Sequence, residues 1–192
     1  EPEQMNDITT KYIVITSSNF PEGGPGANYL NLFCRGLLSQ GSDISVYLLK
    51  GHAFGNIKYY GPRTNISTDG VPFTYLGFRQ RPNNKLLKLA DQFLSFIRLQ
   101  ALLFSILVKG KPVTVLLYNS DLFFNISVHI AGKFTKIKVV KFAAEIIDKS
   151  QYRPSILGRV SRAAYMVNFH YLNKMSDILI VFSHYLRDEF LK

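Results

Sequence analysis

The sequence predicts an α/β fold: a Rossmann-like, three-layer domain with a mostly parallel sheet. Three observations lead to this prediction. Strand-like and helix-like segments alternate along nearly the whole chain, which is typical of βαβ units. Continuous apolar runs such as Val113–Tyr118 are typical of strands buried on both faces. A glycine-rich turn separates the first strand-like segment from the first helical pattern.

The first third of the chain predicts two strands around one helix. Lys11–Thr16 is an apolar run that predicts a buried strand. Apolar residues then recur at helical spacing over Ala27–Gln40, and Gly41 supplies a helix stop. Ile44–Leu49 predicts the second strand, and residues 50–70 predict an excursion or a short hairpin.

The middle of the chain continues the alternation. Val71–Leu76 predicts a third strand, and Asn84–Lys109 predicts a long helix that ends at a glycine. This helix is apolar on more than one face, so it is either deeply packed or docks elsewhere. Val113–Tyr118 predicts a strand and Asp121–Phe134 a helix.

The last third predicts two more strands, over Lys136–Phe142 and Ile178–Phe182. Between them Ser155–Met175 predicts one long helix, and a final helix begins at Tyr185. The whole pattern predicts a sheet of six or seven strands.

We expect one Rossmann-like domain over residues 11–192, preceded by a flexible tail over residues 1–10, because no linker interrupts the pattern. The single cysteine, Cys34, excludes an internal disulfide and fits a reducing compartment. Leu99–Val108 is the longest apolar segment; it carries Gln100 and Ser105 and is too short to span a membrane. We therefore expect a cytoplasmic protein, with the inner face of the membrane as a candidate location.

The formal net charge of +10 favours anionic partners: nucleic acid, phosphorylated ligands or an acidic membrane. The basic residues are scattered, and no nucleic-acid motif is present, so nucleic acid is not expected. Arg153, Arg159 and Arg162 surround a predicted helix that also carries aromatic residues, which suits an anionic bilayer surface. The alternative is an ordinary core helix whose arginines are solvated.

The glycine-rich turn, Glu22–Asn28, is a candidate phosphate or sugar-hydroxyl site. Backbone N–H groups at Gly23, Gly24 and Gly26 would lie at the positive end of the following helix. Asn28 would contact phosphate or acceptor, or would simply cap the helix. The turn lacks both the dinucleotide fingerprint and the phosphate-loop motif.

Polar residues at other predicted strand ends would share the same edge of the sheet. Asn119 and Ser120 follow one strand, although Ser120 or Asp121 can alternatively cap the next helix. Ser183 and His184 follow the last strand and are candidate rim residues. The histidines lack ligand-like spacing, so no metal site is expected.

Two carboxylates, Glu145 and Asp148, follow the strand over residues 136–142. A carboxylate at a strand end can bind sugar hydroxyls or accept a proton. The alternative for both is a solvated surface position.

Several pieces together resemble the opening half of a known enzyme family. They are the strand followed by Ser17–Pro21 and the glycine turn, the segment Phe142–Asp148, and the run Met175–Leu186. This order is similar to the N-terminal domain of retaining GT-B glycosyltransferases of family four. Residues 41–44 depart mildly from that pattern, because Gly-Ser-Asp-Ile replaces Gly-His-x-Val.

The resemblance implies a two-domain enzyme of polysaccharide or glycan assembly. This half would bind a sugar or lipid-linked glycan acceptor, with Glu145 as the catalytic carboxylate. A second half would hold the nucleotide-sugar donor, whose diphosphate would face Gly24 and Gly26, and no other cofactor is implied. This half alone would be inactive in transfer. The alternative is a stand-alone Rossmann-type module that binds a nucleotide or another small molecule.

Overall fold

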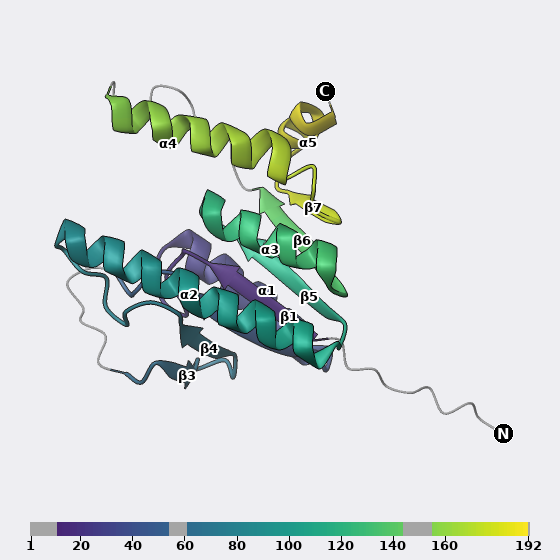
Figure 1. The fold of residues 1–192 in the computed structure, drawn as a ribbon. Helices are drawn as coiled ribbons and strands as arrows, with labels where there is room; N and C mark the ends of the chain where they lie inside the picture. Colours follow the sequence, from purple (N-terminus) through teal and green to yellow (C-terminus); the bar gives the residue numbers. More distant parts are fainter. Residues whose placement is uncertain (1–10, 54–60, 144–154, 192) are drawn as a thin grey trace.

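The computed structural model describes residues 11–53, 61–143 and 155–191. In this part of the chain one seven-stranded sheet forms the centre, with strand order β3-β4-β2-β1-β5-β6-β7 (Figure 1). All neighbouring strands are parallel except β3, which runs antiparallel to β4. The strands are β1 (Lys11–Thr16), β2 (Asp43–Leu48), β3 (Thr64–Ile66), β4 (Pro72–Tyr75), β5 (Val113–Tyr118), β6 (Ile137–Ala143) and β7 (Ile178–Val181).

Helices cover both faces of this sheet, which confirms the predicted α/β, Rossmann-like fold. In Figure 1, α2 and α3 lie in front of the sheet and α1 lies behind it. The helical segments are α1 (Pro25–Ser39), α2 (Lys85–Lys109), α3 (Leu122–Phe134), α4 (Ile156–Val167), the π-helical turn η2 (Asn168–Leu172) and α5 (His184–Leu191).

Each face of the sheet has its own hydrophobic core, built by alternate residues of the same strands. Val14 of β1 packs with Leu30 and Cys34 of α1. Its neighbours Ile13 and Ile15 belong to the opposite core, with residues of α2 and α3. Because successive side chains of a strand point to opposite faces, a strand buried on both sides must be apolar throughout.

The order of the strands reverses at β1. After β1 the chain forms β2, β3 and β4 on one side of β1. It then crosses to the other side of β1 and forms β5, β6 and β7 there. The two central strands end level with each other, because Thr16 pairs with Tyr118. Such a switch point leaves a crevice at the carboxyl ends of the strands.

Within residues 50–70, where the sequence predicts an excursion or a short hairpin, the short strand β3 pairs antiparallel with β4, as in a hairpin. The sequence predictions need correction at two places. The helix expected over 155–175 ends as an α-helix at Val167 and continues as a π-helical turn. The first helix begins at Pro25, two residues earlier than predicted. The predicted tail, residues 1–10, lies outside the described residues.

Polar groups fix the inner face of α2 to the loops that follow β2 and β4. The buried Asp91 carboxylate accepts a hydrogen bond from the Phe78 backbone N–H at 2.5 Å. Ser95 donates to the Leu49 carbonyl at 2.7 Å, and Arg98 donates to the Leu76 carbonyl at 2.8 Å. Burial raises the pKa of Asp91 above its ordinary value, and its hydrogen bonds and nearby cations oppose that rise. The position of α2 therefore depends on satisfied buried polar groups as well as on apolar packing.

Helix α2 also corrects the expectation that no segment is long enough to cross a membrane. Its 25 residues include a window with mean hydropathy of 1.4, so by length and composition it qualifies as a span. The residues buried on its inner face are nevertheless part of the domain: Asp91, Ser95, Leu99, Leu103 and Ile106. Many of its other apolar residues are exposed, and they are considered below.

We predict that Gly77→Ala destabilises the domain by about 2 kcal/mol or more, because overpacking a filled site costs roughly this much. A Cβ atom at Gly77 would lie 2.0 Å from Asp91 Oδ1 and 2.5 Å from Ser95 Oγ. The matched control is Gly36→Ala on α1, where a Cβ meets nothing within 4 Å. The control should stabilise by about 0.5–1 kcal/mol through helix propensity. Urea unfolding measures the free energy of unfolding of both variants. Equal changes in the two variants would contradict the close packing of α2 against Gly77.

Candidate functional site

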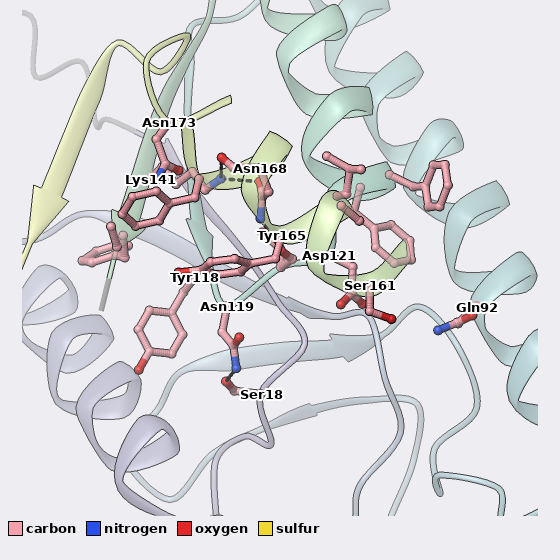
Figure 2. Close-up of a pocket in the computed structure, with 18 of the residues that line it drawn as sticks. Ser18, Gln92, Tyr118, Asn119, Asp121, Lys141, Ser161, Tyr165, Asn168 and Asn173 are labelled. Atoms are coloured by element: carbon pink, nitrogen blue, oxygen red, sulfur yellow. Dashed lines mark hydrogen bonds between the residues drawn. The ribbon is translucent and has the colours of Figure 1, made fainter. Parts of the chain in front are cut away.

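A cavity of about 1120 Å³ lies at the carboxyl ends of β1, β5 and β6. In Figure 2 the labelled polar residues around it include one group with Lys141, Asn168 and Asn173 and another with Ser18 and Asn119. Its lining combines polar side chains, some from strand ends and some from helices, with apolar and aromatic side chains that come mostly from helices. The polar side chains are Ser18, Gln92, Asn119, Ser120, Asp121, Lys141, Ser161, Asn168 and Asn173.

The ends of β1 and β5 are joined by hydrogen bonds. The Ser17 backbone N–H donates to the Asn119 carbonyl at 3.1 Å. The Asn119 side chain donates to Ser18 Oγ at 3.1 Å. Asn119 has a φ of 47°, the left-handed region that asparagine tolerates better than most residues. This backbone turn places its side chain on the cavity rim.

Asp121 connects the same edge to β2. Lys50 Nζ lies 2.8 Å from Asp121 Oδ2, and Ser17 Oγ donates to that oxygen at 3.3 Å. Asp121 stands at the N-cap position of α3, but its side chain makes no capping hydrogen bond. The Asp121 carboxylate therefore binds the residues that follow β1 and β2, and it does not cap α3.

The glycine turn forms a wall of the cavity through Pro25 and Gly26. Gly26 lies close to β5, because a Cβ there would be 3.2 Å from the Tyr118 hydroxyl. Gly24 is the N-cap of α1, and no side chain caps this helix. The positive end of α1 thus lies beside the cavity. Asn28 does not cap the helix: it lies within the first turn and is exposed.

Lys141 is the buried cation of the site. It points from β6 and is only 5% exposed, and its ammonium group donates to Asn168 Oδ1 at 2.5 Å and to the Asn168 carbonyl at 3.4 Å. Among the ion pairs of the described residues, none includes Lys141. Burial lowers the pKa of Lys141 to about 7, because the charged form loses hydration. The group therefore changes its charge near neutral pH.

A network of amides and hydroxyls surrounds this lysine. Asn125, which is fully buried, donates to Asn168 Oδ1 at 2.7 Å and to the Ser120 carbonyl at 3.1 Å. Ser120 Oγ donates to Asn125 Oδ1. The carbonyl that receives Lys141 also accepts the backbone N–H of Asn173 at 3.2 Å, the i+5 bond of the π-helical turn. Such turns occur often at functional sites.

One buried acceptor in the cavity wall has no hydrogen-bond partner among the described residues. It is Oδ1 of Asn173, which is 4% exposed. Buried polar atoms are nearly always paired, so an unpaired acceptor beside a cavity is a candidate contact for a ligand hydroxyl.

The opposite wall of the cavity is apolar and aromatic. It is formed by α2, α3, α4 and η2 and contains Leu89, Phe93, Phe96, Leu122, Phe123, Phe124, Ala164, Tyr165 and Phe169. The site as a whole can hold an amphipathic molecule, with polar groups toward the strand ends and apolar groups toward the helices.

The structure brings together only some of the residues predicted from the sequence. Gly26, Asn119 and Ser120 line the cavity, whereas Gly23, Gly24 and Asn28 do not. Ser183 accepts a hydrogen bond from the Leu186 N–H at 3.2 Å, and so begins α5. Neither Ser183 nor the exposed His184 lines the cavity.

The remaining predicted residues stay as predictions. Arg159 is exposed and Arg162 is half-buried, both on α4. Glu145, Asp148 and Arg153 lie outside the described residues.

Sequence reasoning missed Lys141, Asn168 and Asn173. One signal was present: a lysine stands inside the otherwise apolar end of a predicted two-sided strand. A charged residue there is either exposed at the edge of the sheet or buried against polar partners.

The chain superposes on sucrose-phosphate synthase from Thermosynechococcus elongatus with a TM-score of 0.63 and 14% sequence identity. The match covers 93% of this chain and 45% of that protein, so the chain spans less than half of its structural neighbour. At this identity the likeness shows the fold alone, an α/β, Rossmann-like domain. No protein-family model and no curated protein sequence matches the chain.

We predict that Lys141→Met changes the pH dependence of stability. The folded-state pKa of about 7 lies below the ordinary lysine value of 10.5, so folding disfavours the charged form. The stability cost of Lys141 is therefore complete below about pH 7 and is relieved as the pH rises toward the unfolded value. Wild type should gain stability relative to Lys141→Met between pH 7 and pH 9, as measured by urea unfolding. The same pH dependence of the free energy of unfolding in wild type and in Lys141→Met would contradict the lowered pKa of the buried Lys141. Lys138→Met, at an exposed position of the same strand, is the control.

Proposed function

We propose that this chain is the acceptor-binding half of a glycosyltransferase that uses a nucleotide-sugar donor in glycan or polysaccharide assembly. The observation that carries the proposal is the amphipathic cavity at the switch point of a glycosyltransferase-like fold. Ligands of open α/β sheets bind at this place. The family-four and retaining assignments belong to the same proposal and rest on the sequence resemblance.

The residues around the cavity have distinct roles in this proposal. Asn119 and Asn173 offer an amide and an unpaired carbonyl oxygen to acceptor hydroxyls. Lys141 binds an anionic group, such as a phosphate on the acceptor, because its present partners are neutral amide groups. An anion would favour the charged form of this lysine.

The donor side of the reaction is assigned to a second half. The uncapped N-terminus of α1, at Gly24 and Gly26, faces the donor diphosphate and stabilises the negative charge of the leaving group. Glu145 remains the proposed catalytic carboxylate. We propose no resident cofactor, because the nucleotide sugar is a co-substrate, and we propose a cytoplasmic location.

The first test is isothermal titration calorimetry of the chain with UDP-sugars and GDP-sugars. An acceptor half should bind them weakly, with Kd of about 1 mM or above. Micromolar binding would contradict the proposal and would favour a stand-alone nucleotide-binding module, which shares the same strand order.

The second test blocks the cavity. We predict that Ala164→Trp, which places an indole in the cavity, abolishes binding of sugar phosphates and lipid-linked monosaccharides in ligand-observed NMR. Ala163→Trp, at the exposed neighbouring position on the same helix, should leave binding unchanged. Equal binding to both variants, or binding by neither variant nor wild type, would contradict an acceptor site in this cavity.

A further inference from the structure

Helix α2 carries a second apolar face that points away from the sheet. Its exposed residues recur every three or four positions and include Phe93, Ile97, Phe104 and Val108. This spacing places them on one stripe of the helix, on the side opposite the stripe buried on the sheet. Phe104 is 65% exposed and Val108 is 69% exposed, so neither side chain is needed for the core.

Helix α3 extends this surface. Phe123, Ile130 and Phe134 are exposed and are separated by seven and four residues, which places them on one face. The two helices pack side by side on the same face of the sheet (Figure 1). At their C-terminal ends they meet around a small cleft that includes Leu107 and Phe134. We call the exposed apolar residues of α2 and α3 the α2–α3 face.

Lysines flank the α2–α3 face at both ends. Lys85 and Lys88 stand in the first turn of α2. Lys111, Lys133 and Lys136 line the small cleft at the other end, together with apolar side chains. None of these five lysines takes part in an ion pair among the described residues. Between residues 85 and 136 the acidic residues are the buried Asp91 and the paired Asp121.

We propose that the α2–α3 face binds the surface of an anionic lipid bilayer. A large exposed apolar surface marks an interaction site. Exposed aromatic and aliphatic side chains enter the interfacial layer, and lysines around them contact anionic headgroups. The unpaired lysines at both ends favour an anionic membrane over a neutral apolar partner.

The cavity opens next to this surface. Phe93 and Phe123 belong both to the α2–α3 face and to the apolar wall of the cavity. A molecule anchored in the bilayer by a lipid chain would therefore reach the cavity without leaving an apolar environment. This consequence rests on the proposed function, whereas the membrane contact itself does not.

The membrane contact is tested by co-sedimentation of the chain with vesicles of phosphatidylcholine, with or without phosphatidylglycerol. Wild type should sediment with the anionic vesicles, and high salt or omission of phosphatidylglycerol should weaken this binding. The double variant Phe104→Asp/Val108→Asp should bind about tenfold or more weakly, because two apolar side chains no longer enter the interface.

The matched control is Leu32→Asp, a similarly exposed residue of α1 on the other side of the sheet. It should bind like wild type, and circular dichroism should show both variants folded. A second comparison, Arg159→Glu/Arg162→Glu, tests whether α4 provides the contact instead. Loss of binding in that pair alone would overturn the assignment to α2 and α3.

Three other results would also overturn the proposal. The first is absence of sedimentation with any vesicle. The second is concentration-dependent dimerisation, without vesicle binding, that the double variant abolishes; this would assign the face to a second copy. The third is resistance of vesicle-bound protein to alkaline carbonate, which would indicate that α2 spans the bilayer.

Discussion

The structure depends on the level ending of β1 and β5 at the point where the strand order reverses. Thr16 and Tyr118 are paired, so the segments that follow them start at the same height. One segment leads through the glycine turn into α1 on one face, and the other leads into α3 on the opposite face. The helices diverge, and the crevice between them receives side chains from both strand ends. A register shift by one residue would exchange the two faces of either strand and remove this crevice.

Burying Lys141 costs free energy, and the site reduces this cost without an acidic partner. A carboxylate beside it would hold the lysine permanently charged, whereas amide oxygens of Asn168 bind the ammonium group and leave its pKa near 7. The backbone carbonyl of Asn168, the first residue of the π-helical turn, accepts a hydrogen bond from the same ammonium group. An anion that enters the cavity would therefore meet a cation whose charge is not already neutralised. This arrangement favours phosphorylated or otherwise acidic ligands over neutral sugars.

The fold was predictable from the sequence because buried parallel strands and amphipathic helices leave strong local patterns. Asn119 and Ser120 were predictable for the same reason, since a strand end can be located and its neighbours in a parallel sheet share an edge. The pairing of β3 with β4 was not, because three residues between turns carry little periodicity. Nor was the contact between Lys141 and Asn168, which are 27 positions apart: no local pattern specifies which helix residue will reach a given strand residue. The end of the α-helix at Val167 was also not predicted, because the spacing of side chains in a π-helical turn is close to that of an α-helix.

Helix α2 shows why composition alone misjudges the relation of a helix to a membrane. The mean hydropathy of α2 reaches that of a membrane-spanning segment, but two different faces of the helix contribute to this value. The inner face must be apolar around Leu99 and Leu103 to pack on the sheet, and Asp91 is tolerated there only because backbone N–H groups satisfy it. The outer face has no such packing requirement, so its phenylalanines are not explained by folding. A solvent-exposed helix face is normally polar, and each exposed apolar side chain here adds a risk of aggregation. The exposed apolar residues of α2 are therefore best explained by a molecule that the α2–α3 face contacts. Because this face is continuous with the apolar wall of the cavity, that contact would lie beside the proposed ligand.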